Sequence, residues 1–213
     1  MASVQKAGST DQSESAAELA ARIGTHFRES ANLKLSSAER LAAPIARAAS
    51  LMVESLRAGG KILACGNGGS AADAQHFAAE LVNRFEVERP PLAAVALTTD
   101  SSALTSIAND YRYEDVFAKQ LRALGRAGDV LLAISTSGNS ASVLEAVAVA
   151  QALGVRVVAL TGGHGGRLGE RIAQGDVHVN VPHTSTARVQ EVHLLALHCL
   201  CDAIDHQMFG AKS

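Results

Sequence analysis

The chain has 213 residues, of which 47% are hydrophobic and 19% are charged, and this composition suits one soluble domain with a sizeable core. Nineteen Lys and Arg residues stand against 21 Asp and Glu residues, so the formal charge is -2 and the basic footprint of a nucleic-acid binder is missing. Aromatic residues make up 3% and Trp is absent, which argues against a surface for base stacking. We expect no direct contact with nucleic acid.

Location and redox state follow from simple patterns. No stretch approaches the roughly 20 consecutive apolar residues of a membrane span, and the start of the chain lacks the pattern of a secretory signal. We therefore expect a cytoplasmic protein that does not contact the membrane. The three cysteines, Cys65, Cys199 and Cys201, form no CxxC pair, so we expect buried, reduced thiols rather than a disulfide framework or a cysteine zinc site.

The first 15 residues are rich in Ser, Gln, Gly and Thr and almost lack large apolar side chains, which predicts a disordered tail over residues 1–15. Residues 16–213 are expected to form a single domain. Apolar residues recur at helical spacing from Ala16 onward, and a second helix fits Ser37 to Arg57 before Gly59 and Gly60. Two N-terminal helices are therefore predicted ahead of the rest of the fold.

Short apolar runs then alternate with stretches of helical pattern. The runs, which read as strands, are Lys61 to Cys65, Leu92 to Leu97, Val130 to Ile134, Val155 to Leu160 and Val177 to Val181. The helical stretches are about Ser70 to Phe85, Tyr113 to Leu124, Ser140 to Leu153 and Ala187 to Phe209. Continuous apolar strands separated by helices predict an α/β fold, namely an open, doubly wound, parallel five-stranded sheet.

Ligands of such sheets bind beyond the carboxyl ends of the strands, where two loops are unusual. Residues 66–71 (GNGGSA) follow the first strand, and their glycines allow close approach of an anion to a helix N-terminus. Residues 135–140 (STSGNS) follow the third strand and offer four hydroxyls, which suits a phosphate monoester. Ordinary turns and caps have the same composition, and the first loop with Asp100 also matches a dinucleotide fingerprint.

The helix after the first loop contains His76 and Glu80, which lie four residues apart and therefore on one face. The pair could supply two metal ligands or a general base beside an orienting group. A surface hydrogen bond within the helix is the simpler alternative.

The last predicted helix offers several candidates, namely Gln190, Glu191, His193 and His198. Glu191 and His198 share a face at seven residues, whereas Gln190 and His198 are separated by about 80° and about 12 Å of rise. Periodicity does not choose between these pairs. A lone histidine in a Leu-rich helix is most often a core or interface residue.

Four motifs together resemble the phosphoheptose isomerases of the sugar isomerase (SIS) superfamily. They are CGNGGSAADAQHFAAEL, the pair Asn109-Asp110, LLAISTSGNSASV and RVQEVHLLALHCLCDAID, and the resemblance covers about Ser37 to Phe209. It implies an SIS-type fold and the interconversion of D-sedoheptulose 7-phosphate with D-glycero-D-manno-heptose 7-phosphate, which feeds lipopolysaccharide and related heptose glycans. It also implies a homotetramer whose active sites lie between subunits.

Individual roles carry over by position in the motifs. The resemblance implies Glu80 as the catalytic base and His198 as the catalytic acid, and it implies a zinc ion, Zn(2+), bound by His76, Glu80, Gln190 and His198. The substrate would be bound by Glu80 and Gln190 and by the loop residues, which are Asn67, Gly68, Gly69, Asn109, Asp110, Ser135, Thr136, Ser137 and Ser140.

The residue types suit this chemistry, because isomerisation through an enediol needs a carboxylate near the substrate carbons and a second group near the oxygens. Two alternatives belong to other classes. The chain is also similar to the DnaA initiator-associating proteins, which are tetrameric binding modules, but these lack the acid and histidine found here as Glu80 and His198. A sugar-phosphate sensor uses the same fold, although no DNA-binding appendage accompanies it here.

Overall fold

The computed structural model describes residues 15–210. All of the predicted tail except Ser15 therefore lies outside the described residues. Ser15 is the N-cap of helix α1 (Ala16–Arg57), and it forms a capping box with Glu18. The prediction of two N-terminal helices was wrong, because α1 is one helix of 42 residues. Ser37, where the second helix was predicted to begin, lies inside α1 and is buried.

The sheet has the predicted architecture. Its strands are β1 (Ile62–Cys65), β2 (Ala94–Ala96), β3 (Val130–Ser135), β4 (Arg156–Gly162) and β5 (Val177–Val181). All pair in parallel, in the order β2-β1-β3-β4-β5. In the register, Cys65 lies beside Ala133. Since β1 and β3 are neighbours, the loops that follow them leave the same edge of the sheet side by side.

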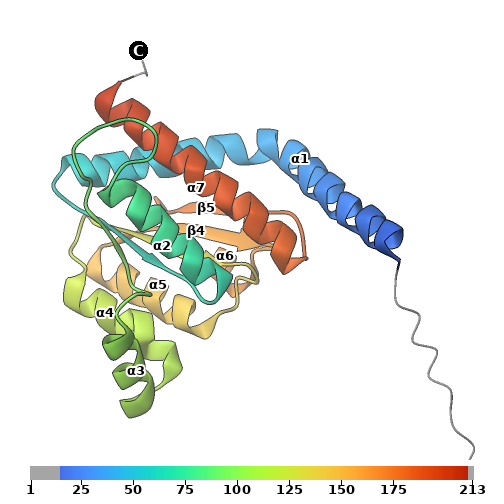
Figure 1. Cartoon of the computed structure of the whole chain (residues 1–213). Coiled ribbons are helices and arrows are strands. Elements are labelled where there is room, and N and C mark those ends of the chain that lie inside the picture. The colour runs from blue at the N-terminus through green and yellow to red at the C-terminus, as the bar shows by residue number, and fades with distance from the viewer. Residues whose placement is uncertain (1–14, 211–213) are drawn as a thin grey trace, which may run out of the picture.

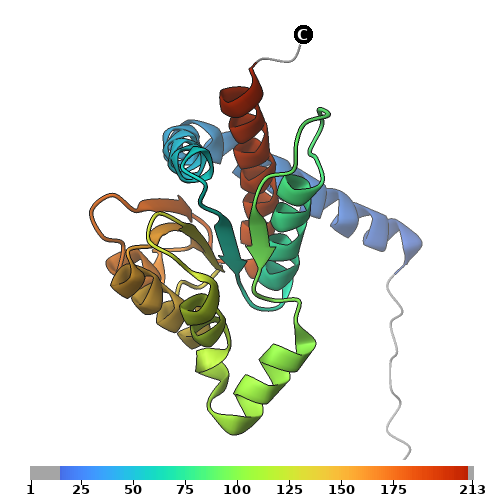
Figure 2. The same ribbon diagram turned by 90° about the vertical axis from the view of Figure 1, so that its left-hand side faces the viewer.

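Helices cover both faces of the sheet, as Figures 1 and 2 show. They are α2 (Gly69–Val82), α3 (Ser101–Asp110), α4 (Val116–Leu124), α5 (Ala141–Leu153), α6 (Gly166–Glu170) and α7 (Thr186–Phe209), with a 3-10 turn at Tyr113–Asp115. One core packs α1, α2 and α7 against one face of the sheet, and the other packs α4, α5 and α6 against the opposite face. The fold is therefore the doubly wound α/β class that the sequence predicts.

Two helices, α3 and α6, were not predicted from the sequence. Helix α3 has no fully buried residue, and its apolar side chains, Leu104, Ile107 and Ala108, are only half-buried against the second core, while α6 has only five residues. The strands are read correctly because they are apolar throughout: along β3, Val130 and Leu132 enter one core whereas Leu131 and Ala133 enter the other.

The N-terminal half of α1 extends beyond the body of the molecule in Figure 1. It carries large apolar side chains that are 44–75% exposed, namely Leu19, Ile23, Phe27 and Leu35. Monomeric proteins seldom display such a stripe, so this half of the helix has the character of a contact surface. Across residues 15–210, no helix is long and apolar enough to cross a membrane.

Candidate active site

Two loops form one end of the site. The loop after β1 leads into α2 through Gly68, which has a positive φ of 56°, and the loop after β3 leads into α5 through Ser140. Neither helix receives a side-chain hydrogen bond at its N-cap. Because the first turns of helices attract anions, the two adjacent N-termini form a region suited to a phosphate.

A hydrogen bond joins the loop after β1 to the first turn of α5, which follows the second loop. The Asn67 amide donates to the Ser142 hydroxyl at 2.9 Å, and within the second loop the Ser135 hydroxyl donates to that of Ser140 at 3.2 Å. The Tyr113 hydroxyl donates to the Asn67 side-chain oxygen at 2.8 Å. Sequence reasoning missed Tyr113 and Ser142, because these contacts span 46 and 75 residues and leave no local signal.

The backbone of the second loop is tightly fixed. Gly138 has a φ of 66°, and its N–H donates to the Ser135 carbonyl at 3.0 Å. The Thr136 carbonyl accepts from Gly162 N–H at 2.9 Å. Thr136 is half-buried and Ser137 is exposed, so their hydroxyls remain within reach of a ligand while the backbone that carries them is held in place.

The predicted substrate residues Asn109 and Asp110 lie at the end of α3. Both are exposed, and the Asn109 amide donates to the Asp110 carboxylate at 2.8 Å. Asp100 is the N-cap of the same helix, and its carboxylate accepts from Ala103 N–H at 2.9 Å. Asp100 therefore has a structural partner, which removes the main support for the dinucleotide alternative.

The other end of the site lies where α2 runs beside α7 (Figures 1 and 2). His76 Nε2 and Glu80 Oε1 are 2.9 Å apart, so the hydrogen bond within the helix is formed. The His198 ring from α7 packs edge-on against His76, with centroids 5.1 Å apart, and also contacts Phe85 at 5.5 Å. Glu80 and His198, the predicted base and acid, thus share one partly exposed cluster around His76.

Gln190 lies at the other end of this seam. It sits so close to Gly69 that a Cβ added there would clash with the Gln190 amide. Gln190 therefore lies beside the glycine loop, whereas His198 lies in the cluster with Glu80. This separation is expected, because about 12 Å of helix lies between Gln190 and His198. Glu191, the rival candidate, is paired with Arg188 at 2.9 Å.

Asp73 is a candidate that sequence reasoning missed. It lies four residues after Gly69 and three before His76, on the same side of α2. Its Oδ2 is buried and lacks a hydrogen-bond partner among residues 15–210, and burial raises the pKa of this carboxyl to about 6, although nearby His76 opposes the shift. Its three-residue spacing from His76 and seven-residue spacing from Glu80 place it on the same helix face, so helical periodicity would have included it.

His193 is the core histidine that the Leu-rich pattern favoured. It is fully buried, and because a carbonyl can only accept, its Nε2–H donates to the Thr161 carbonyl at 3.0 Å. Burial lowers the pKa of His193 to about 4, although that hydrogen bond opposes the shift.

This burial predicts a pH-dependent stability. The unfolded chain binds a proton at His193 below about pH 6.5, whereas the folded chain binds it only near pH 4. As the pH is lowered from 6.5 to 4, the free energy of unfolding should therefore decrease by about 1.4 kcal/mol per pH unit. Urea unfolding at several pH values, compared with a His193→Gln variant, checks this. Equal pH slopes for the two proteins would contradict it.

The cysteine prediction is correct for two of three residues. Cys65 and Cys201 are free and buried, and burial raises the pKa of each thiol to about 12. Cys199 is free but exposed, so its predicted burial was wrong. It lies on the side of α7 that faces the groove beside α1 rather than the sheet.

Comparison with known proteins places this arrangement in a family. Residues 25–162 match the family model of the SIS domain. The chain is 65% identical over 195 residues to a phosphoheptose isomerase from Aromatoleum aromaticum, covering 92% of this chain and 98% of the relative. The chain belongs to the phosphoheptose isomerase family. The motifs predicted this membership correctly.

Solved structures agree with the assignment. A phosphoheptose isomerase from Neisseria gonorrhoeae superposes with a TM-score of 0.84 at 56% identity, covering 88% of this chain and 98% of that one. One from Francisella tularensis gives a TM-score of 0.86 at 46% identity, with the same coverage. The SIS-type fold predicted from the sequence is thereby confirmed.

The zinc ion implied by the family can be tested against the donors. Imidazole and carboxylate are suitable zinc ligands, and His76, Glu80 and His198 are close together. Within residues 15–210, however, no three His, Cys, Asp or Glu side chains are arranged to hold a metal ion. Gln190 lies apart from His198, so a single copy of residues 15–210 does not assemble the predicted set of ligands.

Proposed function

We propose that the protein interconverts D-sedoheptulose 7-phosphate and D-glycero-D-manno-heptose 7-phosphate. The observation that carries this proposal is that helix α2 presents a region suited to phosphate binding at one end and candidate proton-transfer residues at the other. Its N-terminus adjoins a hydroxyl-rich loop, and its C-terminal half presents Glu80 beside His76 and His198. The high identity to relatives named phosphoheptose isomerase supports the same activity.

The phosphate is bound at the loop end. Thr136 and Ser137 offer hydroxyls, and the first turns of α2 and α5 add backbone N–H groups and favourable helix dipoles. Asn67 links the loop after β1 to the first turn of α5 through Ser142, and Tyr113 holds the Asn67 side chain. Binding energy from this remote phosphate orients the reacting carbons, which lie at the other end of the sugar.

Proton transfer is assigned to Glu80 and His198. The Glu80 carboxylate removes a proton from C1 of the ketose, which gives an enediol, and the carboxylic acid then returns a proton to C2. His198 donates a proton to the C2 oxygen and accepts the one from the C1 hydroxyl, so that the aldose forms without net gain or loss of protons. His76 orients Glu80 through the 2.9 Å hydrogen bond.

The active site is proposed to lie between subunits of a homotetramer. Glu80 is eleven residues beyond Gly69, or about 16 Å along α2, and no hydrogen bond within residues 15–210 links it to the serine loop. In a tetramer, the serine loop of one subunit could lie closer to Glu80 of a neighbouring subunit than to its own Glu80. The exposed apolar side chains of α1 support such assembly.

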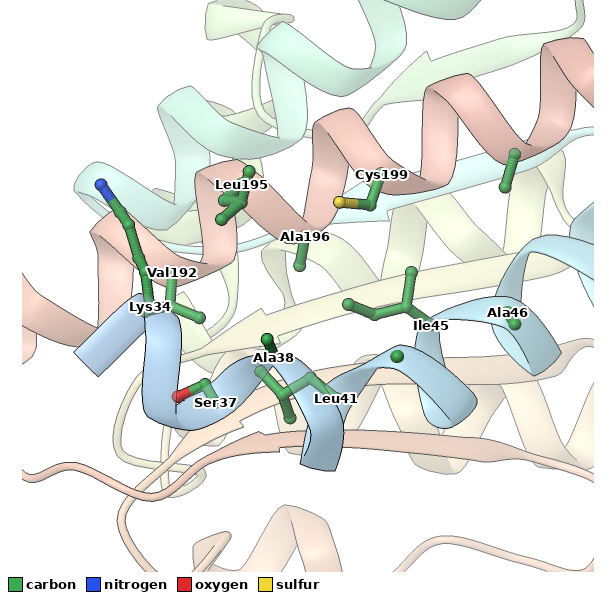
Figure 3. Close-up of a pocket in the computed structure, with 12 residues that line it drawn as sticks. Lys34, Ser37, Ala38, Leu41, Ile45, Ala46, Val192, Leu195, Ala196 and Cys199 are labelled. Atoms are coloured by element: carbon green, nitrogen blue, oxygen red, sulfur yellow. The ribbon is translucent and has the colours of Figure 1, made fainter. Parts of the chain in front are cut away.

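A groove between α1 and α7 offers a further apolar surface for a neighbouring subunit (Figure 3). It has a volume of about 370 Å³, and Leu41, Ile45 and Val192 are among its apolar lining residues. Leu195 on its rim is 43% exposed. Burying this surface against another copy would be favourable at about 25 cal/mol per Å².

Zinc remains a proposal for the assembled protein, with His76, Glu80, Gln190 and His198 as its ligands. When bound it would act as a Lewis acid toward substrate oxygens. The cytoplasmic location, the single domain over residues 16–213 and the supply of heptose to lipopolysaccharide likewise stay predictions.

The activity is tested by incubating the purified protein with sedoheptulose 7-phosphate and detecting the aldose by NMR, with and without a chelator and with added zinc. We expect turnover that a phosphate-free sedoheptulose does not support. Loss of turnover with chelator, regained with zinc, would support the metal proposal, and full turnover without metal would contradict it. No turnover in any metal condition would contradict the isomerase and favour a binding module, such as one that contacts DnaA.

A further inference from the structure

Arg89 lies in the segment between α2 and β2, and its guanidinium is buried, with only 1% of the side chain exposed. Its Nε donates to the Asp205 carboxylate of α7 at 2.7 Å. Its terminal nitrogens donate to the main-chain carbonyls of Glu80 at 2.8 Å and Leu81 at 2.7 Å, with longer contacts to Asn83 and Pro90. One buried side chain therefore joins the end of α2 to α7.

The Glu80 and Leu81 carbonyls lie in the last turn of α2, where the helix supplies no further N–H group to bind them, and the Leu81 carbonyl also accepts from Leu92 N–H at 3.0 Å. A cation at this position is favoured by the helix dipole, and the planar fork of arginine directs its donors in fixed directions. A lysine carries the same charge but has a single ammonium group, which could not bind both carbonyls and Asp205 in this geometry.

Two of the Arg89 contacts lead to the proton-transfer pair. The carbonyl at 2.8 Å belongs to Glu80 itself. Asp205 is seven residues after His198, two turns along α7 and therefore on nearly the same face. The path from the Glu80 backbone through Arg89 to Asp205 is thus a short connection between the two helices that carry the carboxylate and the imidazole.

The pair is also costly to maintain. Both side chains are buried, and Asp205 Oδ2 has no hydrogen-bond partner among residues 15–210. Replacing a buried ion pair by apolar residues of similar size is often neutral or stabilising. Stability alone therefore gives little reason for this pair, whereas control of the distance between two helices does.

We propose that Arg89, held by Asp205, is a positioning residue that sets the separation of the Glu80 carboxylate and the His198 imidazole. This inference rests on the proposed isomerase activity. A small displacement of one reacting group can lower the rate by about 10²-fold, while substrate binding at the distant serine loop is left largely intact.

The test uses the full-length protein with three changes: Arg89→Lys, the apolar double replacement Arg89→Met with Asp205→Leu, and Lys61→Met as a control. Lys61 pairs with buried Asp129 at 2.6 Å at the starts of β1 and β3, away from the site. Its loss should lower Tm without changing kcat. For Arg89→Lys we expect kcat about 10²-fold lower with KM within about threefold.

The double variant separates positioning from stability. We expect the Tm of the double variant to be close to that of wild type, while its kcat is about 10²-fold lower than that of wild type. Recovery of both Tm and kcat would overturn the proposal, as would a KM increase that accounts for the whole loss.

A readout independent of turnover keeps the inference apart from the proposed function. The imidazole NMR signals of His76 and His198 should move in the double variant and stay unchanged in Lys61→Met. If wild type fails to turn over but these signals move, the isomerase proposal fails and the positioning role stands. Unmoved signals would overturn the positioning role whether or not the protein is active.

Discussion

Replacing Glu80 by Gln is expected to lower kcat for heptose 7-phosphate interconversion by about 10²–10⁴-fold, the usual contribution of a general base. The amide keeps an oxygen that can accept the hydrogen bond from His76, which is 2.9 Å from the carboxylate in the wild type. The helix and the His198 contact should therefore persist, so Tm should change little. Turnover followed by NMR, together with thermal unfolding, measures both quantities.

Glu88→Gln is the matched control. This substitution makes the same chemical change at a side chain that is 91% exposed and forms a long ion pair with Arg84 at 3.5 Å. Its kcat should equal that of wild type. If Glu80→Gln turned over as fast as Glu88→Gln, Glu80 would not be the base and the mechanism would be wrong.

Replacing Gly138 by Ala is expected to lower the free energy of unfolding by about 2–5 kcal/mol. About 1–2 kcal/mol comes from the left-handed backbone, whose φ is 66°, and about 1–3 kcal/mol comes from forcing a methyl group against the Gly165 carbonyl. Because Gly138 fixes the turn that presents Ser137, KM should also rise at least about tenfold, the value of one lost hydrogen bond to a charged group.

Gly128→Ala separates the two contributions. Gly128 has a φ of 92°, but nothing lies within 4 Å of an added Cβ. Urea unfolding should show a loss of only about 1–2 kcal/mol, with unchanged KM. Equal losses in the two variants would show that the Gly165 contact is unimportant, and an unchanged KM for Gly138→Ala would argue against phosphate binding by this loop.

The sequence predicted the layers of the fold because the buried strands and the amphipathic helices leave strong periodic signals. Residues 130–134 are apolar at every position because both faces of β3 are covered. Helix α3 is short and its apolar residues are only half-buried, so its signal is weak, and the break predicted before Ser37 is absent because Ser37 is buried within α1. Local patterns therefore failed where helix residues are only partly buried or where a predicted boundary lies inside a longer helix.

The site was predictable where its residues lie on one element. His76 and Glu80 share a helix face, and the serine loop is contiguous in sequence. Contacts across the fold could not be predicted: Arg89 reaches Asp205 across 116 residues, and Gln190 packs on Gly69. Helical rise did predict that Gln190 and His198 lie apart, but only the fold shows which neighbour each one has.

The most direct test is a crystal structure of the Glu80→Gln variant with sedoheptulose 7-phosphate bound. We expect the phosphate to lie within hydrogen-bond distance of the Ser135–Ser140 loop. The C1–C2 end should lie within about 3.2 Å of the residue 80 side chain and of His198, each from the same copy or a neighbour. A substrate held by the serine loop with C1 and C2 beyond that reach of both groups in every copy would contradict the account.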